Sequence, residues 1–161
     1  RSAGFYSGEY AENQAKMAIA MNQMMTGNTF LYYGDELGMK GSGQDENKRC
    51  AMQWSSDEAA DGMCVGPNPS PIEMKYGSLE DQVDDPYSIY NFTKHTLKLR
   101  NQYPVIARGD TTFEEAYSDD NICVLKKTYE GEEMVFVFNI SSSNSISFKG
   151  GNIISFGRRC F

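Results

Sequence analysis

An apolar run placed directly after an amphipathic segment is the feature that most restricts the fold of this chain. Residues 9–26 carry apolar side chains at helical spacing, Gly27 follows them, and Thr29–Tyr33 (TFLYY) comes next. This short run does not alternate polar and apolar side chains, which is typical of a buried strand in a parallel sheet. A helix, a tight turn and a buried strand together predict one unit of an α/β barrel or of a doubly wound sheet.

The apolar face of the predicted helix is rich in methionine. Its members are expected to pack in the core: Met17, Ala18, Met21, Met24 and Met25. Because methionine side chains are flexible, an exposed methionine-rich binding surface is the alternative.

The next segment, residues 34–85, is long and rich in Gly, Ser, Asn, Asp and Pro. A stretch of this length without regular structure inside a compact domain is usually functional. A short helical turn is expected at residues 77–80 (GSLE). The segment opens with four glycines, at positions 34, 38, 41 and 43. They lack the Gly-Lys-Ser/Thr ending of a phosphate-binding loop, so we expect them to permit sharp turns.

A second helix is predicted to start at Asp85-Pro86, because aspartate caps helices and proline fits their first position. Its inner face is expected to carry Ile89, Phe92, Thr96 and Leu99. His95 is the only histidine and lies among cations toward the end of this helix. We expect it to be solvated there rather than catalytic.

Beyond Tyr103-Pro104 the sequence changes to short β-rich runs. Residues 122–127 and 134–139, joined across residues 130–132 (EGE), predict a hairpin, and 146–148 and 153–156 predict shorter strands. Two domains are therefore expected, with residues 1–104 forming the α/β part and residues 105–161 a small antiparallel β domain. Its strands are few for a free-standing sandwich, which fits an incomplete domain.

Charge and cysteine content argue against two kinds of site. The chain has 15 basic and 22 acidic residues and a net charge of −7, whereas nucleic-acid affinity depends on Lys and Arg contacts to phosphate. The cysteines, at positions 50, 64, 123 and 160, contain no CxxC pair, so no metal site is expected. Free thiols are the favoured interpretation, and a Cys50–Cys64 bridge is the alternative. No apolar run is long enough to cross a bilayer, and no signal peptide is visible.

The stretch GNTFLYYGDELGMKG…DENKRCAMQW resembles the α-amylase family of glycoside hydrolases, of the bacterial type. In that family, a phrase like G-x-P-F-x-Y-Y-G-x-E-x-G-M forms the eighth barrel strand and opens the loop after it. A loop phrase of the type D-x-x-x-R-x-P-M-x-W follows, which here contains Asp45, Arg49, Met52, Gln53 and Trp54, with Ala51 where proline is common. The segment LRNQYPVIARGD resembles the end of the last barrel helix, which leads into a C-terminal β domain.

This resemblance covers nearly all of residues 1–148 and implies a fold of the α/β plus β class. Residues 1–104 would be the C-terminal part of the (β/α)8 catalytic barrel, which is the last βα portion of a TIM barrel. Residues 105–161 would be a small antiparallel β-sandwich domain, although the final stretch NIISFGRRCF does not resemble the usual ending of that domain.

The resemblance also implies that no catalytic residue lies in this chain. The family's three catalytic carboxylates lie at the ends of the fourth, fifth and seventh barrel strands. The last of them belongs to an Asn-His-Asp phrase that would precede Arg1-Ser2. Glu36 is not assigned as an acid, because Asp35 and Glu36 are adjacent and would face opposite ways on an extended strand. The resemblance makes Glu36 a structural hydrogen-bonding residue near the cleft.

Four residues are candidates for substrate binding: Asp45, Arg49, Tyr33 and Trp54. Loops after the strands line the active-site face of a barrel, and a carboxylate with a guanidinium suits sugar hydroxyls. The resemblance implies that Asp45 and Arg49 bind glucose on the non-reducing side of the cleavage point, while a structural salt bridge is an equal alternative. Trp54 is expected to anchor its loop in the core, with stacking on a sugar as the alternative. One of Tyr32 and Tyr33 is expected to point inward.

The function implied by the resemblance is that of the C-terminal part of a retaining hydrolase of α-1,4-glucans, such as starch and maltooligosaccharides, inactive by itself. A non-catalytic module that binds glucan or a partner chain is the alternative. No cofactor is expected in this chain, and a calcium ion would be held elsewhere in the full-length enzyme. Unpaired edges at residues 29–33 predict self-association. The resemblance implies a secreted or cell-surface protein of a bacterium, with a cytoplasmic location as the alternative.

Overall fold

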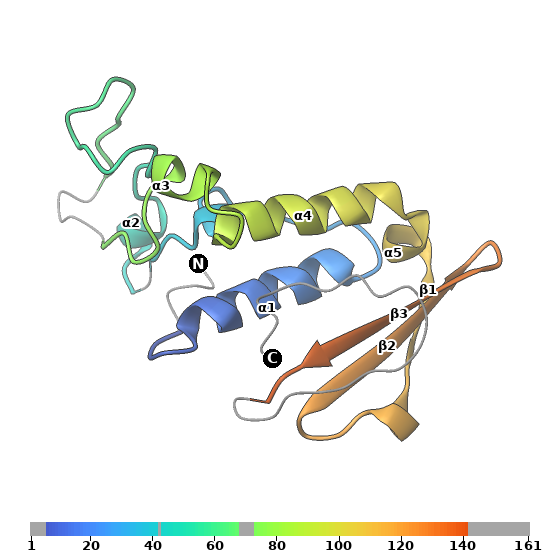
Figure 1. The fold of residues 1–161 in the computed structure, drawn as a ribbon. Coiled ribbons are helices and arrows are strands. Elements are labelled where there is room, and N and C mark those ends of the chain that lie inside the picture. Colours follow the sequence, from blue (N-terminus) through green and yellow to red (C-terminus); the bar gives the residue numbers. More distant parts are fainter. Residues whose placement is uncertain (1–5, 42, 68–72, 142–161) are drawn as a thin grey trace. The chain divides into compact units, whose positions relative to one another are not determined.

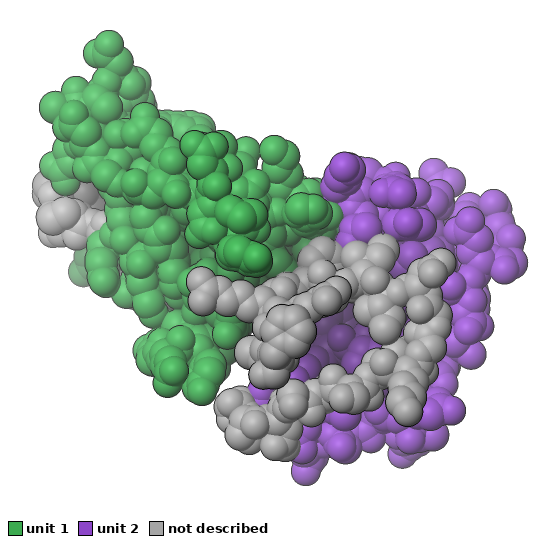
Figure 2. Space-filling view, in the orientation of Figure 1, with its two compact units in different colours: residues 1–23, 29–97 green, residues 24–28, 98–161 purple. Residues whose placement is uncertain are grey.

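The computed structural model describes residues 6–41, 43–67 and 73–141 of the chain (Figure 1). In order, the elements are α1 (Ala11–Met24), η2 (Asp35–Leu37), α2 (Asp45–Lys48), α3 (Leu79–Val83), α4 (Ile89–Gln102), α5 (Pro104–Arg108), β1 (Asp110–Phe113), η3 (Glu115–Tyr117), β2 (Ile122–Tyr129) and β3 (Glu132–Asn139). Two compact units are distinguished in Figure 2: Arg1–Gln23 with Thr29–Leu97 (unit 1), and Met24–Asn28 with Lys98–Phe161 (unit 2). The strands predicted at 146–148 and 153–156 lie outside the described residues.

The core of unit 1 forms where α1 meets the beginning of α4. Ala15, Ile19 and Ile89 are buried there, and three half-buried aromatic side chains pack against them: Tyr6, Tyr76 and Phe92. The predicted helix 9–26 is thus confirmed as α1, with each end within two residues of the expectation.

The predicted methionine face of α1 is wrong. The side chains of Met21 and Met25 are 36% and 47% exposed, and of the five expected core residues only Met24 is fully buried. The buried face instead contains Ala11, Ala15, Ile19 and Gln23. Residues four apart lie on the same side of a helix. In this sequence apolar residues have that spacing on two sides of the helix, the methionine side and the alanine side. The alanine side faces the core. Packing against the other elements, not the spacing, decides which of the two sides is buried.

The predicted buried strand at Thr29–Tyr33 is also wrong. These residues have no regular structure, and the side chain of Phe30 is 87% exposed. A strand requires a neighbour to pair its backbone N–H and C=O groups. Among the described residues the strands form a single sheet of β1, β2 and β3, all in unit 2. Without a neighbouring strand, the apolar run forms no strand.

Helix α4 begins three residues later than the Asp85-Pro86 start that was predicted. The backbone N–H of Asn91 donates to Ser88 Oγ at 3.1 Å, so Ser88 caps the helix. Asp85 stabilises the preceding turn instead, accepting from the N–H of Tyr87 at 2.8 Å. Ile89 and Thr96 are buried on the inner face as predicted, together with Thr93. The side chain of His95 is exposed, as expected.

Unit 2 contains an antiparallel sheet in the order β1-β2-β3. The hairpin of β2 and β3 confirms the strand pair expected at 122–127 and 134–139, with each strand two residues longer. Its register pairs Tyr129 with Glu132, which leaves a two-residue turn. Both turn residues have positive φ, 49° at Glu130 and 85° at Gly131, as a tight hairpin turn requires. Strand β1, which the sequence did not reveal, pairs with the other side of β2.

A buried lysine anchors the interior of unit 2. Lys127 is fully buried, and its Nζ donates to Thr26 Oγ1 at 2.7 Å and to the carbonyl oxygen of Ile106 at 3.0 Å. Burial lowers the pKa of Lys127, and the charge of Arg100 lowers it further. Arg100 itself donates to the carbonyl oxygens of Met25 and Gly27. Arg100 thus binds two carbonyl groups of the segment 25–27, while Lys127 binds the hydroxyl of Thr26 and a carbonyl group of α5.

Candidate functional site

The candidate site is the long loop between η2 and α3 in unit 1. Its base is closed by an ion pair in which Lys40 Nζ lies 2.7 Å from Glu73 Oε2. The hydrogen bond from Lys40, followed by its charge, lowers the pKa of the Glu73 carboxyl. Further along, a Cβ placed on Gly66 would lie 2.9 Å from the backbone nitrogen of Ala51, so these two stretches of chain touch. The loop therefore folds back on itself.

The two carboxylates that begin this region lie in a turn, not in a strand. Asp35 and Glu36 are part of the 3-10 helix η2, which is flanked by Gly34 and Gly38 at φ values of 82° and 66°. The expectation that the two side chains face opposite ways on an extended strand is therefore wrong. Glu36 Oε2 is buried and accepts no hydrogen bond from the described residues. Positive φ at Gly34, Gly38 and Gly43 confirms the sharp turns that were predicted there.

Asp45 and Arg49 form an ion pair on the short helix α2. Arg49 Nη2 lies 3.0 Å from Asp45 Oδ2, and the two side chains are 55% and 71% exposed. Such an exposed pair stabilises a fold by only about 0–1 kcal/mol, so it does little to hold the loop. The guanidinium and the carboxylate both retain hydrogen-bonding positions that face solvent. The pair is thus suited to bind a polyhydroxylated ligand.

Tyr33 lies beside the residue that follows this pair. Its hydroxyl donates to the carbonyl oxygen of Cys50 at 2.9 Å, and its ring centroid is 4.7 Å from that of Tyr32. The side chains are 46% exposed at Tyr32 and 41% exposed at Tyr33, so the expectation that one of them points inward is wrong. The structure therefore connects Tyr33 to the loop directly after Arg49.

The indole of Trp54 is accessible, which contradicts its expected role as a core anchor. The side chain is 45% exposed. Its backbone is held by α3, because the N–H of Glu80 donates to the carbonyl oxygen of Trp54 at 3.2 Å and that of Leu79 to Gln53 O at 2.9 Å. The neighbouring side chain of Gln53 is buried and replaces Trp54 as the inward-facing residue. A partly exposed aromatic ring can stack on the apolar face of a sugar.

Helix α3 holds this part of the loop through a capping box. The N–H of Asp81 donates to Ser78 Oγ at 3.4 Å, and the N–H of Ser78 donates back to Asp81 Oδ2 at 2.8 Å. Ser56 Oγ also donates to Asp81 Oδ2. The hydrogen bond from Ser56, followed by those from Ser78, lowers the pKa of the Asp81 carboxyl. The spacing Ser-x-x-Asp in the sequence is a signal from which this box could have been predicted.

Asp81 should make the stability of the chain depend on acid pH. Because the pKa of Asp81 is lower in the folded state than its usual 3.8, the unfolded chain binds the proton more tightly. The contribution of Asp81 to the free energy of unfolding is present in full above pH 3.8, and it is lost as the pH falls through the lowered pKa. We expect Asp81→Asn to flatten the acid side of a urea-unfolding profile measured between about pH 2 and 6. Asp84→Asn, at an exposed neighbour, is the control; an equal flattening in both variants would contradict this role.

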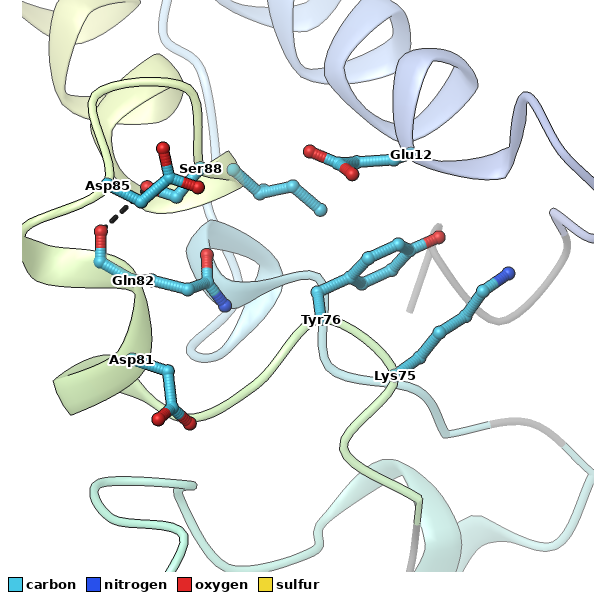
Figure 3. A pocket seen from close by; sticks show the side chains of 8 residues that line it. Glu12, Lys75, Tyr76, Asp81, Gln82, Asp85 and Ser88 are labelled. Carbon is cyan, nitrogen blue, oxygen red and sulfur yellow. Dashed lines mark hydrogen bonds between the residues drawn. The ribbon is translucent and has the colours of Figure 1, made fainter.

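Sequence reasoning missed a small polar pocket beside α3. Its volume is about 220 Å³, and it is lined by Glu12, Lys75, Tyr76, Asp81, Gln82, Asp85, Ser88 and Ile89 (Figure 3). The buried amide of Gln82 donates from Nε2 to the carbonyl oxygens of Leu37 at 2.9 Å and Gly77 at 3.1 Å. Its Oε1 accepts from the N–H of Tyr90 at 3.1 Å. No apolar period marks a glutamine as buried, so the sequence contains no signal for this position.

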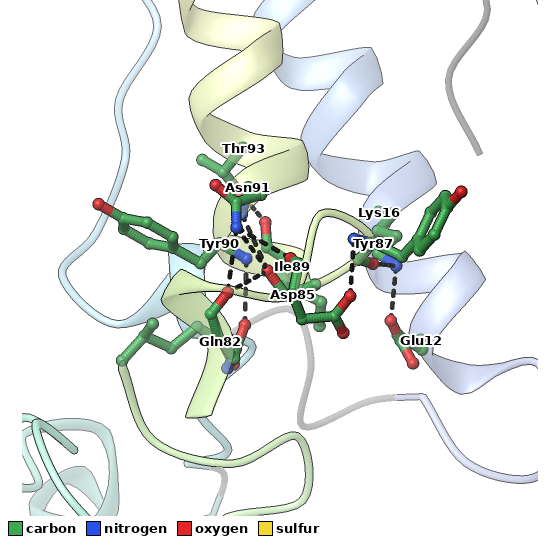
Figure 4. Close-up of polar contacts among 11 residues, drawn as sticks. Glu12, Lys16, Gln82, Asp85, Tyr87, Ile89, Tyr90, Asn91 and Thr93 are labelled. Carbon is green, nitrogen blue, oxygen red and sulfur yellow. Dashed lines mark hydrogen bonds and ion pairs between the residues drawn. The ribbon is translucent and has the colours of Figure 1, made fainter. Parts of the chain in front are cut away.

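Asn91 completes the polar network around Gln82. Its Nδ2 donates to the carbonyl oxygens of Gln82, Val83 and Asp85, at 3.1, 2.9 and 2.9 Å (Figure 4). These carbonyls lie at the end of α3 and in the turn after it. Gln82 and Asn91 thus fix the beginning of α4 against the end of the candidate loop.

The part of the chain that the structure describes contains no cluster of three or more His, Cys, Asp or Glu side chains able to hold a metal ion. A calcium ion held elsewhere in a full-length enzyme stays a prediction. Over the same residues, no helix is both long enough and apolar enough to cross a membrane.

Comparison with known proteins identifies a family. Residues 2–109 match the family model described as alpha amylase, catalytic domain. Alpha-amylase SusG of Bacteroides thetaiotaomicron is 24% identical over 139 residues, which cover 81% of this chain and 20% of that protein. Oligo-1,6-glucosidase of Parageobacillus thermoglucosidasius is 24% identical over 86% of this chain and 31% of its own length. This chain therefore spans less than a third of the length of these relatives.

Solved structures give the same result. Eubacterium rectale Amy13B is 55% identical, with a TM-score of 0.83, over 88% of this chain and 28% of its own. An α-amylase from H. orenii has a TM-score of 0.70 at 23% identity, over 80% of this chain and 25% of its own, which shows a shared fold. The barrel fold of these amylases and the small antiparallel sheet agree with the expected α/β plus β class.

Proposed function

This chain belongs to the α-amylase family of glycoside hydrolases, and from that membership we propose that it is the C-terminal part of a retaining α-glucan hydrolase. In this proposal the enzyme cleaves α-1,4-glucosidic bonds, with an aspartate nucleophile and a glutamate acid/base contributed by residues that precede this chain. The residues of this chain bind and orient the glucan. In this proposal they form the C-terminal end of the catalytic domain and the β domain that follows.

The observation that supports a glucan ligand best is the combination of groups on one loop. Arg49 can donate several directed hydrogen bonds to sugar hydroxyls, and Asp45, held 3.0 Å from it, can accept them. The accessible indole of Trp54 offers an aromatic face. We place a glucose unit on the non-reducing side of the scissile bond against Asp45 and Arg49. Tyr33 positions this loop through its hydrogen bond to Cys50 O.

Calorimetric titration of the 161-residue chain with maltotetraose tests this binding role. We expect Asp45→Ala to weaken binding about 10–100-fold, because it removes hydrogen bonds to a charged group, each worth about 1.5–3 kcal/mol. Glu46→Ala is the matched control, since Glu46 is an exposed carboxylate on the same helix and is not the partner of Arg49. An equal loss of maltotetraose affinity in the two variants would refute the assignment of Asp45 as a glucan-binding residue.

The inactivity of the chain by itself is tested with a chromogenic maltooligosaccharide. We expect no release of chromophore above the rate in buffer, because the nucleophile and the acid/base are not among these residues. Two variants serve as controls, an Asp35→Asn, Glu36→Gln double variant and Asp45→Asn. If the purified chain shows turnover and both variants retain it, the activity comes from a contaminating amylase. Turnover that one of these variants abolishes would refute the proposed inactivity.

A non-catalytic partner-binding role is the second candidate, and exposed apolar residues favour it. Phe30 is 87% exposed, and three neighbours are more than a third exposed: Leu31, Tyr32 and Tyr33. A cluster of water-exposed apolar side chains promotes association with another chain. We propose that two copies of this chain associate through residues 29–33.

Sedimentation of the chain at increasing concentration tests this association. We expect Phe30→Asp to shift the protein to monomer, because a buried carboxylate at the contact would lose its solvation. Val65→Asp is the control, since Val65 is 95% exposed and lies outside the segment. A wild-type chain that sediments as a monomer throughout would refute self-association.

A further inference from the structure

Two cysteines in the candidate loop lie on chain segments that the fold brings together. Cys50 is half-buried and Cys64 is exposed, and both are free thiols in the structure. The thiol of Cys50 points at Lys40 O, 3.8 Å away, and that of Cys64 at Gly62 O, also 3.8 Å away. Neither thiol is held by a strong hydrogen bond, because sulfur is a weak donor.

The backbone of Gly66 connects the two cysteine segments. A Cβ on Gly66 would lie 3.3 Å from Cys50 Cα, so Gly66 packs directly on Cys50. Cys64 is only two residues from Gly66, and two residues span at most about 7 Å. The Cα separation that a disulfide needs, about 4.4–6.8 Å, is therefore within reach of Cys64 without moving Gly66.

The residues on both sides of Cys64 allow that movement. Val65, between Cys64 and Gly66, is 95% exposed, so no packing opposes its rotation. On the other side, Gly62 has a φ of 85° and no atom within 4 Å of its Cβ position. Cys64 thus lies in an exposed segment next to Gly66, and Gly66 packs directly on Cys50.

We propose that Cys50 and Cys64 form a reversible disulfide that locks the candidate loop, with a low-molecular-weight disulfide such as oxidised glutathione as the oxidant. The thiolate of exposed Cys64 attacks one sulfur of the oxidant, which releases one glutathione thiolate and leaves a mixed disulfide. The thiolate of Cys50 then attacks the Cys64 sulfur and releases the second glutathione. The protein loses two protons and two electrons, and one glutathione disulfide becomes two thiols. This inference requires no sugar ligand and does not depend on the proposed function.

The bridge would restrain a defined part of the loop. Cys50 directly follows Arg49, and its carbonyl oxygen accepts the hydrogen bond from Tyr33. Closing the ring from Cys50 to Cys64 reduces the conformations open to residues 51–63, which carry Trp54. Oxidation would therefore act on the segment that contains the accessible indole.

Peptide mapping of the oxidised chain tests the bridge. After treatment with oxidised glutathione and blocking of free thiols, trypsin releases residues 50–75 as one peptide, because no Lys or Arg lies between Arg49 and Lys75. A second cut after Glu58 separates the two cysteines. We expect the halves to stay joined until dithiothreitol is added, and the thiol count of the chain to fall by about two, since one disulfide consumes two thiols.

Variants show whether the pairing is specific. Cys64→Ser should abolish the linked peptide and restore the Cys50 thiol, whereas Cys123→Ser, in strand β2, should leave the linked peptide unchanged. If oxidation leaves the two halves separate, with glutathione on Cys64 alone, the proposal is refuted. A linked peptide that joins Cys50 or Cys64 to Cys123 or Cys160 would refute it equally.

Discussion

We expect Gly38→Val to lower the free energy of unfolding of unit 1 by about 2–5 kcal/mol. Two separate effects produce this loss. Gly38 has a φ of 66°, which a β-branched residue strongly disfavours. A Cβ at this position would also lie 2.6 Å from Ile89 Cδ1 and 2.6 Å from Tyr76 Cδ2. Both of those side chains belong to the core cluster of unit 1, so the new methyl groups overpack it.

Urea unfolding followed by circular dichroism measures this loss, and Gly62→Val separates its two causes. Gly62 has a φ of 85° but no atom within 4 Å of its Cβ position, so valine there meets the backbone penalty alone. We expect Gly38→Val to be the more damaging by about 1–3 kcal/mol, the usual range for overpacking. Equal losses in the two variants would show that the contact with Ile89 and Tyr76 is absent.

The second large effect is expected in unit 2, from Lys127→Ala. The substitution removes about three buried methylene groups, worth roughly 0.8 kcal/mol each, and leaves Ile106 O without its donor. We expect a loss of about 2–4 kcal/mol in the free energy of unfolding. Lys126→Ala is the control, because the Nζ of half-buried Lys126 makes long ion pairs, 3.6 Å from Glu114 and 3.8 Å from Glu133, so we expect its loss to be smaller.

Lys127 should also produce a pH dependence in the alkaline range. Its folded pKa is lowered from 10.5 by burial and by Arg100, so between the lowered value and 10.5 the unfolded chain binds the proton more tightly. The free energy of unfolding should therefore rise as the pH increases through that window. Lys127→Met keeps most of the buried volume and should remove this rise. A variant with the same alkaline profile as the unsubstituted chain would contradict the assignment.

Local signals in the sequence were sufficient for the elements that depend on near neighbours. The hairpin of β2 and β3 was predicted because Glu130-Gly131 lies between two β-rich runs, and its turn requires positive φ at both residues. Helix α1 was predicted from apolar spacing and from the glycine after it. The family phrase around Asp45 and Arg49 located the candidate loop, which the comparisons place in an α-amylase catalytic domain.

Predictions failed where an element depends on a partner that local sequence does not specify. Thr29–Tyr33 has the composition of a strand, but a strand needs a neighbouring strand for its backbone hydrogen bonds. The sheet among the described residues lies in unit 2. The methionines of α1 are apolar, yet α1 buries its alanine stripe. Trp54 was expected in the core, but α3 fixes its backbone and Gln53 takes the inward position.

The sequence by itself determined the family, the two helices, the hairpin and the loop that carries the candidate sugar-binding residues, because these follow from short-range spacing and from phrases of adjacent residues. Only the tertiary structure decided which face of α1 is buried, that Tyr33 reaches Cys50 O, that Gln82 joins three segments and that Gly66 lies on Cys50. Such contacts join residues far apart in the chain. Their free energy depends on distance and burial, which exist only once the chain has folded.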